Sequence, residues 1–158
     1  MVTIRPAASP EDLTIARALF VEYAASVGDD LCFQDFEKEL DALPGAYRLP
    51  EGALLLAGRA GEAVGCVALR PLDPPAIAEI KRLYVRRAGR GAGTGRALID
   101  AILAEARRAG YERVRLDTLP VMKEAQSLYR ALGFVEIPAY RTYPVPGTIF
   151  MELALTAS

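Results

Sequence analysis

The chain has 158 residues, of which 52% are hydrophobic and 25% charged, and its formal net charge is −1. This size and composition are typical of one globular domain, so we expect residues 1–158 to form a single domain. The nearly neutral charge argues against general binding to nucleic acid. No apolar run has the length of a signal peptide core or of a bilayer span, which favours a cytoplasmic location and no membrane partner.

The chain contains no histidine and two cysteines, Cys32 and Cys66. A Ser-His-Asp triad, a Cys-His pair and an HExxH zinc site are therefore excluded. The cysteines form neither a CxxC pair nor another metal-ligand spacing, so each is expected to be a small buried residue, and no metal site is predicted. Acid–base chemistry must then come from Glu, Asp, Tyr or Lys side chains or from water.

The N-terminal part of the chain predicts a short strand and two helices. Residues 2–5 form the strand, and Ser9 is expected to cap a helix that has Pro10 at its first position and acidic residues in its first turn. Apolar residues at helical spacing over residues 33–43 indicate a second, shorter helix, which a Pro-Gly pair would end.

The remaining elements are strands and helices separated by Gly and Pro signals. A run of Asp and two prolines at residues 73–75 is expected to break the chain. Apolar faces at residues 95–109 and 122–132 predict two helices, each followed by a glycine. The expected strands are residues Ala53–Arg59, 63–71, Ile77–Val85, 114–119, 134–137 and 149–155.

A basic, glycine-rich stretch, RRAGRGAGTGRALI at residues 86–99, lies between a predicted strand and a predicted helix. That position brings backbone N–H groups and the positive end of the helix to one point, which suits an anion such as phosphate. Arg90 and Arg96 lie beside this end and would oppose the helix dipole unless an anion binds. The glycines fit neither the P-loop pattern nor the dinucleotide fingerprint. A flexible turn with solvated arginines is the alternative.

The residues around this stretch carry a more specific pattern. The run EIKRLYVRRAGRGAGTGRALI resembles the acyl-CoA-binding motif of the GNAT superfamily of N-acetyltransferases, whose core R/Q-x-x-G-x-G/A is matched by Arg90, Gly93 and Gly95. A second run, AQSLYRALGF at residues 125–134, is similar to the later A-x-x-LY-x-x-x-GF signature of that family. Met122 stands where the family often has an asparagine, and this is the one departure.

The resemblance implies an α/β fold of the GNAT-like acyl-CoA N-acyltransferase type, with a mixed, mostly antiparallel sheet of about seven strands flanked by about four helices. It also implies acetyl-CoA as co-substrate. The loop would hold the pyrophosphate, and the strand before it would bind the pantetheine arm through backbone groups left unpaired where it splays from its neighbour. The expected cofactor-binding residues are Leu83, Tyr84, Val85, Arg90, Gly91, Gly93, Thr94, Gly95 and Arg96.

Two side chains are candidates for proton transfer, because attack on a thioester needs a neutral amine and a protonated leaving thiol. Glu79 stands where the family often has a carboxylate and is the expected general base. Its alternative role is a structural ion pair with an arginine such as Arg70. Tyr129 matches the tyrosine of the LY signature and is the expected general acid, with a core tyrosine as the alternative. Because no histidine can activate Cys66 or Cys32, direct transfer is favoured over a covalent acyl-enzyme.

The acceptor is expected to be a primary amine of a small molecule. A cationic pocket would suit an amine that also carries a carboxylate, such as an amino acid. The alternative to a cationic pocket is a set of solvated surface cations. The alternative acceptor is a protein N-terminus or lysine, and the alternative function is a non-catalytic acyl-CoA-binding module. A homodimer is one assembly considered, since the sequence does not fix the oligomeric state. The Pro- and Tyr-rich segment at residues 137–147 is either a substrate-facing loop or a rigid connection. The cations considered are Arg48, Arg70, Lys81, Arg82 and Arg141.

Overall fold

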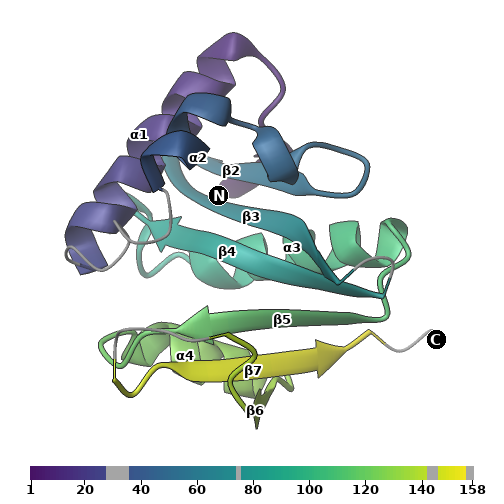
Figure 1. Ribbon diagram of the computed structural model, residues 1–158. Helices are drawn as coiled ribbons and strands as arrows, with labels where there is room; N and C mark the ends of the chain where they lie inside the picture. Colours follow the sequence, from purple (N-terminus) through teal and green to yellow (C-terminus); the bar gives the residue numbers. More distant parts are fainter. Residues whose placement is uncertain (28–35, 74–75, 142–145, 156–158) are drawn as a thin grey trace.

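The structure is a computed structural model that describes residues 1–27, 36–73, 76–141 and 146–155. A mixed sheet lies at its centre, with the strand order β1-β2-β3-β4-β5-β7-β6 (Figure 1). Neighbouring strands are antiparallel except β4 and β5, which are parallel, so the predicted sheet type is confirmed. The strands are β1 (Val2–Pro6), β2 (Ala53–Arg59), β3 (Glu62–Asp73), β4 (Ile77–Val85), β5 (Arg113–Thr118), β6 (Val135–Ile137) and β7 (Ile149–Ala154).

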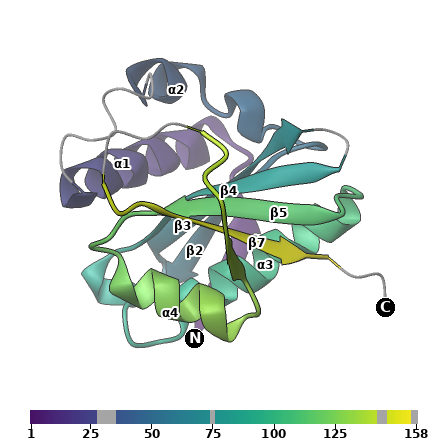
Figure 2. The ribbon, with the colours of Figure 1, turned by 60° about the horizontal axis from the view of Figure 1, so that its bottom comes forward.

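Helices cover both faces of the sheet: α1 and α2 pack on one face, and α3 and α4 on the other (Figure 2). The predicted helices are present with small shifts at their ends. The predicted start of the second helix at residue 33, and the two prolines at 74–75, lie outside the described residues. No helix in the described ranges has both the length and the apolar character that crossing a membrane requires. The helices are α1 (Pro10–Val27), α2 (Phe36–Ala42), α3 (Thr94–Arg108) and α4 (Lys123–Ala131), with short 3-10 turns η2 (Gly45–Tyr47) and η3 (Arg87–Gly89).

Two apolar layers hold these helices to the sheet, because side chains alternate along each strand. In β3, Val67 and Leu69 join the layer under α3 and α4, whereas Cys66 and Ala68 join the layer under α1 and α2. Each fully buried Leu, Ile or Val stabilises the fold by about 1.5–3 kcal/mol. The central strands are therefore a rigid support for side chains at their ends.

The start of α1 follows the predicted capping chemistry. The Ser9 hydroxyl accepts a hydrogen bond from the N–H of Asp12 at 3.0 Å. The Asp12 carboxylate in turn accepts the N–H groups of Ala8 and Ser9, at 3.0 and 3.3 Å. Donors that the first helical turn would leave without partners are satisfied in this way.

β4 and β5 pair over a short distance and then diverge. Their register covers only Ile77 to Glu79 on β4 and Arg113 to Arg115 on β5. Figure 1 shows the two strands together at the right and apart at the left. The rest of β4 has no β5 partner, so the splayed strand that the family resemblance implies is present.

A bulge interrupts β4 beyond this paired part. Two β4 residues, Arg82 and Leu83, face a single β3 residue there. Arg82 adopts a φ of +62°, which is uncommon for a residue with a side chain. Before the bulge, Glu79 lies on the face of α1 and α2; after it, Leu83 and Val85 pack on the opposite layer. The bulge was not foreseen from the sequence.

Candidate active site

A groove of about 680 Å³ runs along the diverging end of β4, between the loop before α3 and the start of α4. Cavities of this size commonly hold small molecules. The α4 side of the groove includes Val121, Met122 and Leu128. The structure therefore gathers all but one of the predicted cofactor residues on one cavity, Arg96 being outside its lining. The predicted residues that line it are Leu83, Tyr84, Val85, Arg90, Gly91, Gly93, Thr94 and Gly95.

Glycines shape the loop at one end of the groove for two different reasons. Gly91 and Gly93 have φ values of +80° and +74°, and a Cβ on either would meet nothing within 4 Å. Their requirement is conformational, because the left-handed region penalises other residues. Gly89, which we did not single out from the sequence, is required for packing, since a Cβ there would lie 2.8 Å from the Cβ of Val64.

The start of α3 presents backbone donors. The first bond of the helix runs from the N–H of Ala97 to the carbonyl of Gly93 at 3.0 Å. Within the part of the chain that the structure describes, the N–H groups of Thr94, Gly95 and Arg96 therefore have no acceptor. The Thr94 hydroxyl donates to the carbonyl of Gly89 at 2.7 Å and fixes the turn before the helix. These donors and the helix dipole suit an anionic group.

The two arginines of the loop differ in position. Arg90 lines the groove, and its Nε donates to the carbonyl of Val85 at 3.1 Å. Arg96 lies in the first turn of α3, with its Nε 3.2 Å from both carboxylate oxygens of Asp100. Both side chains are exposed. Arg90 is therefore placed to meet a ligand in the groove, whereas the role predicted for Arg96 stays a prediction.

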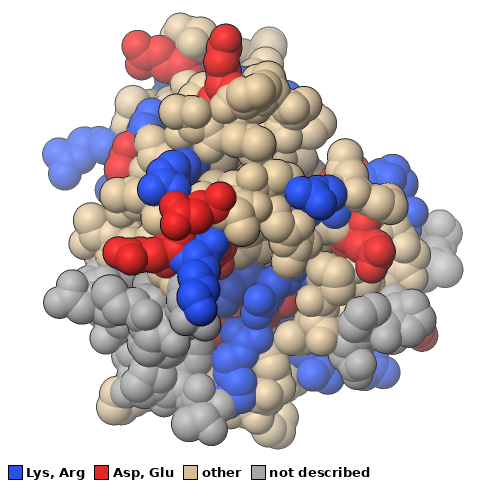
Figure 3. Space-filling view, turned by 45° about the horizontal axis from the view of Figure 1, so that its top comes forward, with Lys and Arg blue, Asp and Glu red and all other residues tan. Residues whose placement is uncertain are grey.

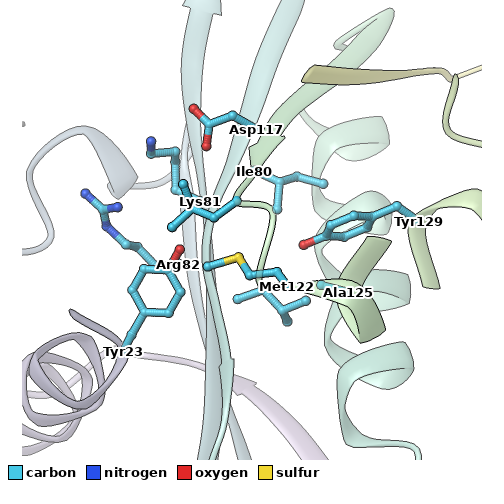
Figure 4. Close-up of a pocket in the computed structure, with 10 residues that line it drawn as sticks. Tyr23, Ile80, Lys81, Arg82, Asp117, Met122, Ala125 and Tyr129 are labelled. Carbon is cyan, nitrogen blue, oxygen red and sulfur yellow. The ribbon is translucent and has the colours of Figure 1, made fainter. Parts of the chain in front are cut away.

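A smaller cavity of about 30 Å³ continues from the inner end of the groove (Figure 4). Its volume is about the space that two water molecules need. Tyr129 lies on one wall with its hydroxyl pointing into the cavity, while its ring packs on Phe134 with a centroid distance of 5.5 Å. Burial raises the pKa of the Tyr129 hydroxyl, so that it stays protonated at neutral pH. A protonated hydroxyl is the form that a general acid needs.

Glu79 is fully buried, and both oxygens of its carboxylate have hydrogen-bond donors as neighbours. Nε and Nη2 of Arg70 donate to Oε1 at 2.9 and 2.7 Å. The Tyr140 hydroxyl donates to Oε2 at 2.6 Å, and Nη2 of Arg141 lies 2.7 Å from the same oxygen. The ion pair with Arg70 that we weighed as the alternative role is therefore present.

The electrostatic setting of Glu79 opposes a role as base. Burial alone would raise the pKa of this carboxyl, but Lys81 and Arg70 and the hydrogen bonds from Tyr140 and Arg141 lower it to about 2. A carboxylate with such a pKa accepts a proton poorly, and no oxygen of Glu79 is free to meet an amine. The assignment of Glu79 as general base stays a prediction, and it requires that one donor leaves.

Three of the five cations considered for an acceptor pocket are paired with carboxylates. Arg70 and Arg141 bind Glu79, and Arg82 donates to Glu39 of α2 at 2.9 and 2.8 Å. Long arginine side chains reached carboxylates on neighbouring segments, which the sequence pattern could not show. Arg48 is exposed on the surface. Lys81 lines the small cavity, and burial lowers its pKa, which Asp117 and Glu79 partly oppose.

Two further site residues escaped the sequence analysis. Asp117 of β5 lines the small cavity, and its Oδ2 lies 3.2 Å from Nη1 of Arg141. Tyr140 lies in the connection between β6 and β7, so part of that Pro- and Tyr-rich segment does face the site. The signal available for Asp117 was an acidic residue flanked by buried Leu116 and Thr118 in a central strand. Nothing in the sequence pointed to Tyr140 itself.

Met122 stands where the related motif often has an asparagine. It lines both the groove and the small cavity, and it is the N-cap of α4 without a side-chain cap bond. A thioether cannot accept the capping hydrogen bond that an asparagine oxygen accepts. Among the described residues, no group of three or more His, Cys, Asp or Glu side chains is arranged to hold a metal ion.

Comparisons with known proteins agree with this geometry. The model of the Acetyltransferase (GNAT) family matches residues 16–134. An uncharacterised N-acetyltransferase of Schizosaccharomyces pombe is 35% identical over 156 residues, covering 98% of this chain and 96% of its own. A GNAT acetyltransferase of Staphylococcus aureus superposes with a TM-score of 0.77 at 20% identity, over 99% of this chain and 100% of its own.

A further structure includes the cofactor. The yncA protein of Salmonella typhimurium, solved with its cofactor acetyl-CoA, superposes with a TM-score of 0.70 at 21% identity, over 99% of this chain and 95% of its own. The family match covers both sequence motifs and the strands and helices that frame the groove. The chain therefore belongs to the GNAT acetyltransferase family and has its acyl-CoA N-acyltransferase fold.

Proposed function

We propose that the protein transfers the acetyl group of acetyl-CoA directly to a primary amine of a small molecule. The observation that supports this most strongly is the continuity of the two cavities. The cofactor-sized groove and the small cavity share Tyr23, Leu83, Met122 and Ala125. A pantetheine arm that follows β4 along the groove would bring its thioester to Tyr129.

The chemistry assigned to the site is one displacement. The amine nitrogen attacks the thioester carbonyl carbon, and the C–S bond breaks as the tetrahedral intermediate collapses. Tyr129 donates its proton to the leaving sulfur and regains one from water. The proton of the amine passes to Glu79 or to water, and the Glu79 route requires a donor to leave its carboxylate. Cys66 takes no part, because burial raises the pKa of its thiol.

Further details belong to the same proposal. A carboxylate on the acceptor stays part of it, although the pairing of Arg70, Arg82 and Arg141 with acidic side chains reduces the number of cations left to bind one. A single domain, a homodimer and a cytoplasmic location also stay proposals. A protein acceptor and a non-catalytic acyl-CoA-binding module are the alternatives that the experiment separates.

The test has two parts, binding and turnover. A ligand at 100 times its Kd stabilises a protein by roughly 2.7 kcal/mol, which is roughly 5–10 °C in Tm for a chain of this length. Acetyl-CoA should give such a shift, and its absence would refute the assignment of the groove. Mass spectrometry of an amine panel incubated with acetyl-CoA should then find an N-acetylated small molecule. Binding without any acetylated product would favour the non-catalytic module, and acetylation of peptides alone the protein acceptor.

A further inference from the structure

The guanidinium of Arg141 lies between two carboxylates on the neighbouring strands β4 and β5. Its Nη2 is 2.7 Å from Oε2 of Glu79, and its Nη1 is 3.2 Å from Oδ2 of Asp117. We propose that Glu79 and Asp117 form the subsite for the positively charged amino group of the acceptor, and that Arg141 is an internal cation that the acceptor must displace. This inference rests on the proposed acetyl transfer, and it adds the charge that the acceptor carries when it binds.

The subsite lies at the point where an acceptor must arrive. Asp117 lines the small cavity together with Tyr129, and both are labelled on it in Figure 4. Glu79 is the last β4 residue paired with β5, and Asp117 lies on β5 just beyond the paired part, so Arg141 links the two carboxylates where the strands begin to separate. An ammonium held there would lie beside the cavity that receives the thioester.

Arg141 is the donor that can leave without disturbing the sheet. Arg70 faces Glu79 directly across the β3–β4 ladder and is fixed by the strand register. Arg141 lies in the connection between β6 and β7, outside any strand or helix, so its backbone position and not its exposure distinguishes it from Arg70. Figure 3 shows Lys and Arg side chains gathered in a hollow on the face that carries α1 and α2. Arg141 can therefore turn towards solvent while Arg70 stays in place.

The local charges explain why displacement is needed. Glu79 and Asp117 supply two negative charges, whereas Arg70, Lys81 and Arg141 supply three positive ones. With Arg141 in place the cluster repels a second cation. With Arg141 turned away the charges of the same groups balance; Oδ2 of Asp117 loses its Arg141 contact, and Oε2 of Glu79 keeps only the hydrogen bond from Tyr140 and can accept a second one. A compact primary ammonium can donate to both oxygens, which a carboxylate or a neutral hydroxyl compound cannot match. Displacement also frees Glu79 to accept a proton.

The first experiment measures cation binding without turnover. Arg141→Ala opens the space between the two carboxylates, and methylammonium chloride is the probe, with sodium chloride added to equal ionic strength. We expect a saturable rise in Tm for Arg141→Ala. The guanidinium carbons of Arg141 and Arg115 lie 5.0 and 5.5 Å from the centroid of the Tyr140 ring, but Arg115 pairs with Glu152, so Arg115→Ala is the matched control. It should give no such rise.

Several outcomes overturn the inference. The subsite is refuted if methylammonium gives no saturable shift in Arg141→Ala, or gives the same shift in Arg115→Ala. If methylguanidinium binds and methylammonium does not, the space is a structural arginine site and not an ammonium subsite. Should Arg141→Ala fail to fold, Arg141→Met retains the aliphatic stem and is titrated in its place.

The second experiment uses the acceptor that the amine panel identifies. In Arg141→Ala the KM for this amine should fall about tenfold, equivalent to about 1.4 kcal/mol, because no internal cation competes. The KM for acetyl-CoA should not change, and Arg141→Lys should keep the wild-type KM for the amine. An unchanged or higher amine KM in Arg141→Ala would refute the competition. Failure of acetyl-CoA to bind would instead refute the proposed function and leave the methylammonium titration valid.

Discussion

The two sides of the opening between β4 and β5 are built differently. The cofactor side is made mainly of backbone: left-handed glycines, the free N–H groups of α3 and the unpaired edge of β4. The acceptor side, as we name the side to which we assign the amine, is made of charged side chains from β3, β4, β5 and the β6–β7 connection, held to one another by ion pairs. A backbone site binds the part of a substrate that is constant, whereas a side-chain network can be rearranged to suit a particular acceptor.

The largest difference between the effects on turnover and on cofactor binding is expected for a substitution of Tyr129, which lies where the two sides meet. Tyr129→Phe keeps the ring in its packed position and removes the proton donor, so kcat should fall by about 10²-fold or more. Acetyl-CoA should still raise the Tm, because the groove is intact. Steady-state kinetics and a thermal titration measure the two effects.

A matched control for this change is Tyr111→Phe. Tyr111 is also buried, and its hydroxyl donates to the carbonyl of Glu51 at 2.7 Å, away from the groove. This variant should lose some stability and keep its kcat. Equal kcat values for Tyr129→Phe and wild type would leave Tyr129 as a core residue only.

Glu79→Gln tests whether the acceptor side does chemistry or only holds a structure. If Glu79 is the base, the rate at pH 7 should fall by about 10²-fold and recover partly at higher pH, where more of the amine is neutral. If Glu79 is only structural, the variant should keep the shape of the wild-type pH–rate profile. The profile of a folded variant decides, whereas a bare loss of activity would not.

The same substitution has a predicted effect on stability against pH. The pKa of Glu79 is about 2 in the folded protein and 4.5 ordinarily, so its ionised form stabilises the fold above pH 4.5 and this contribution is lost as the pH falls towards 2. The contribution is about 3 kcal/mol at neutral pH, as an upper value for a network of this kind. Glu79→Gln should therefore melt earlier at pH 7 and lose less stability on acidification than wild type. If the Tm of the two proteins fell by the same amount between pH 7 and pH 2, the prediction would be contradicted.

The cofactor side can be tested with its two arginines. Arg90→Glu places a negative charge in the groove and should remove most of the acetyl-CoA shift of roughly 5–10 °C. Arg96→Glu, whose side chain lies at Asp100, should remove less. Both variants are compared with their own Tm in the absence of ligand. Equal losses would show that Arg96 turns towards the ligand, as the family resemblance implied.

The smallest effects are expected for two glycines of the loop. Gly91→Ala should lower the stability by about 1 kcal/mol, because an alanine is strained at a φ of +80°. Gly95 has no such φ, and a Cβ there would meet only Leu128 at 3.7 Å, so Gly95→Ala should fold as well as wild type. Its Cβ would occupy space in the groove and should weaken acetyl-CoA binding about tenfold. If Gly91→Ala were as stable as wild type, or Gly95→Ala bound acetyl-CoA with an unchanged Kd, the two glycines would not have the different roles assigned to them.

The difference between the two sides also decides what the sequence reveals. The glycine loop and the helix after it are local in the chain, so their spacing predicts the loop end of the groove, whereas the walls from α1 and α4 come from distant segments. Glu79 could be singled out, but its partners Tyr140 and Arg141 lie about sixty residues away, and only the fold brings them together. The ion pairs of Arg82 and Arg141 could not be predicted for the same reason, because their carboxylate partners are distant in the sequence. Pairing of long side chains depends on strand register, which no spacing rule supplies.

The bulge at Arg82 decides to which face of the sheet the later side chains of β4 point. In a regular strand every second side chain points to the same face, so Leu83 and Val85 would lie on the same face as Glu79. The extra residue reverses this, so that β4 directs the Glu79 carboxylate to the face of α1 and α2 and the side chains of Leu83 and Val85 to the opposite layer. Straightening the strand with no residue lost would exchange the faces of everything after Arg82. A β-branched residue, which resists a positive φ, should therefore be the least tolerated substitution at this position.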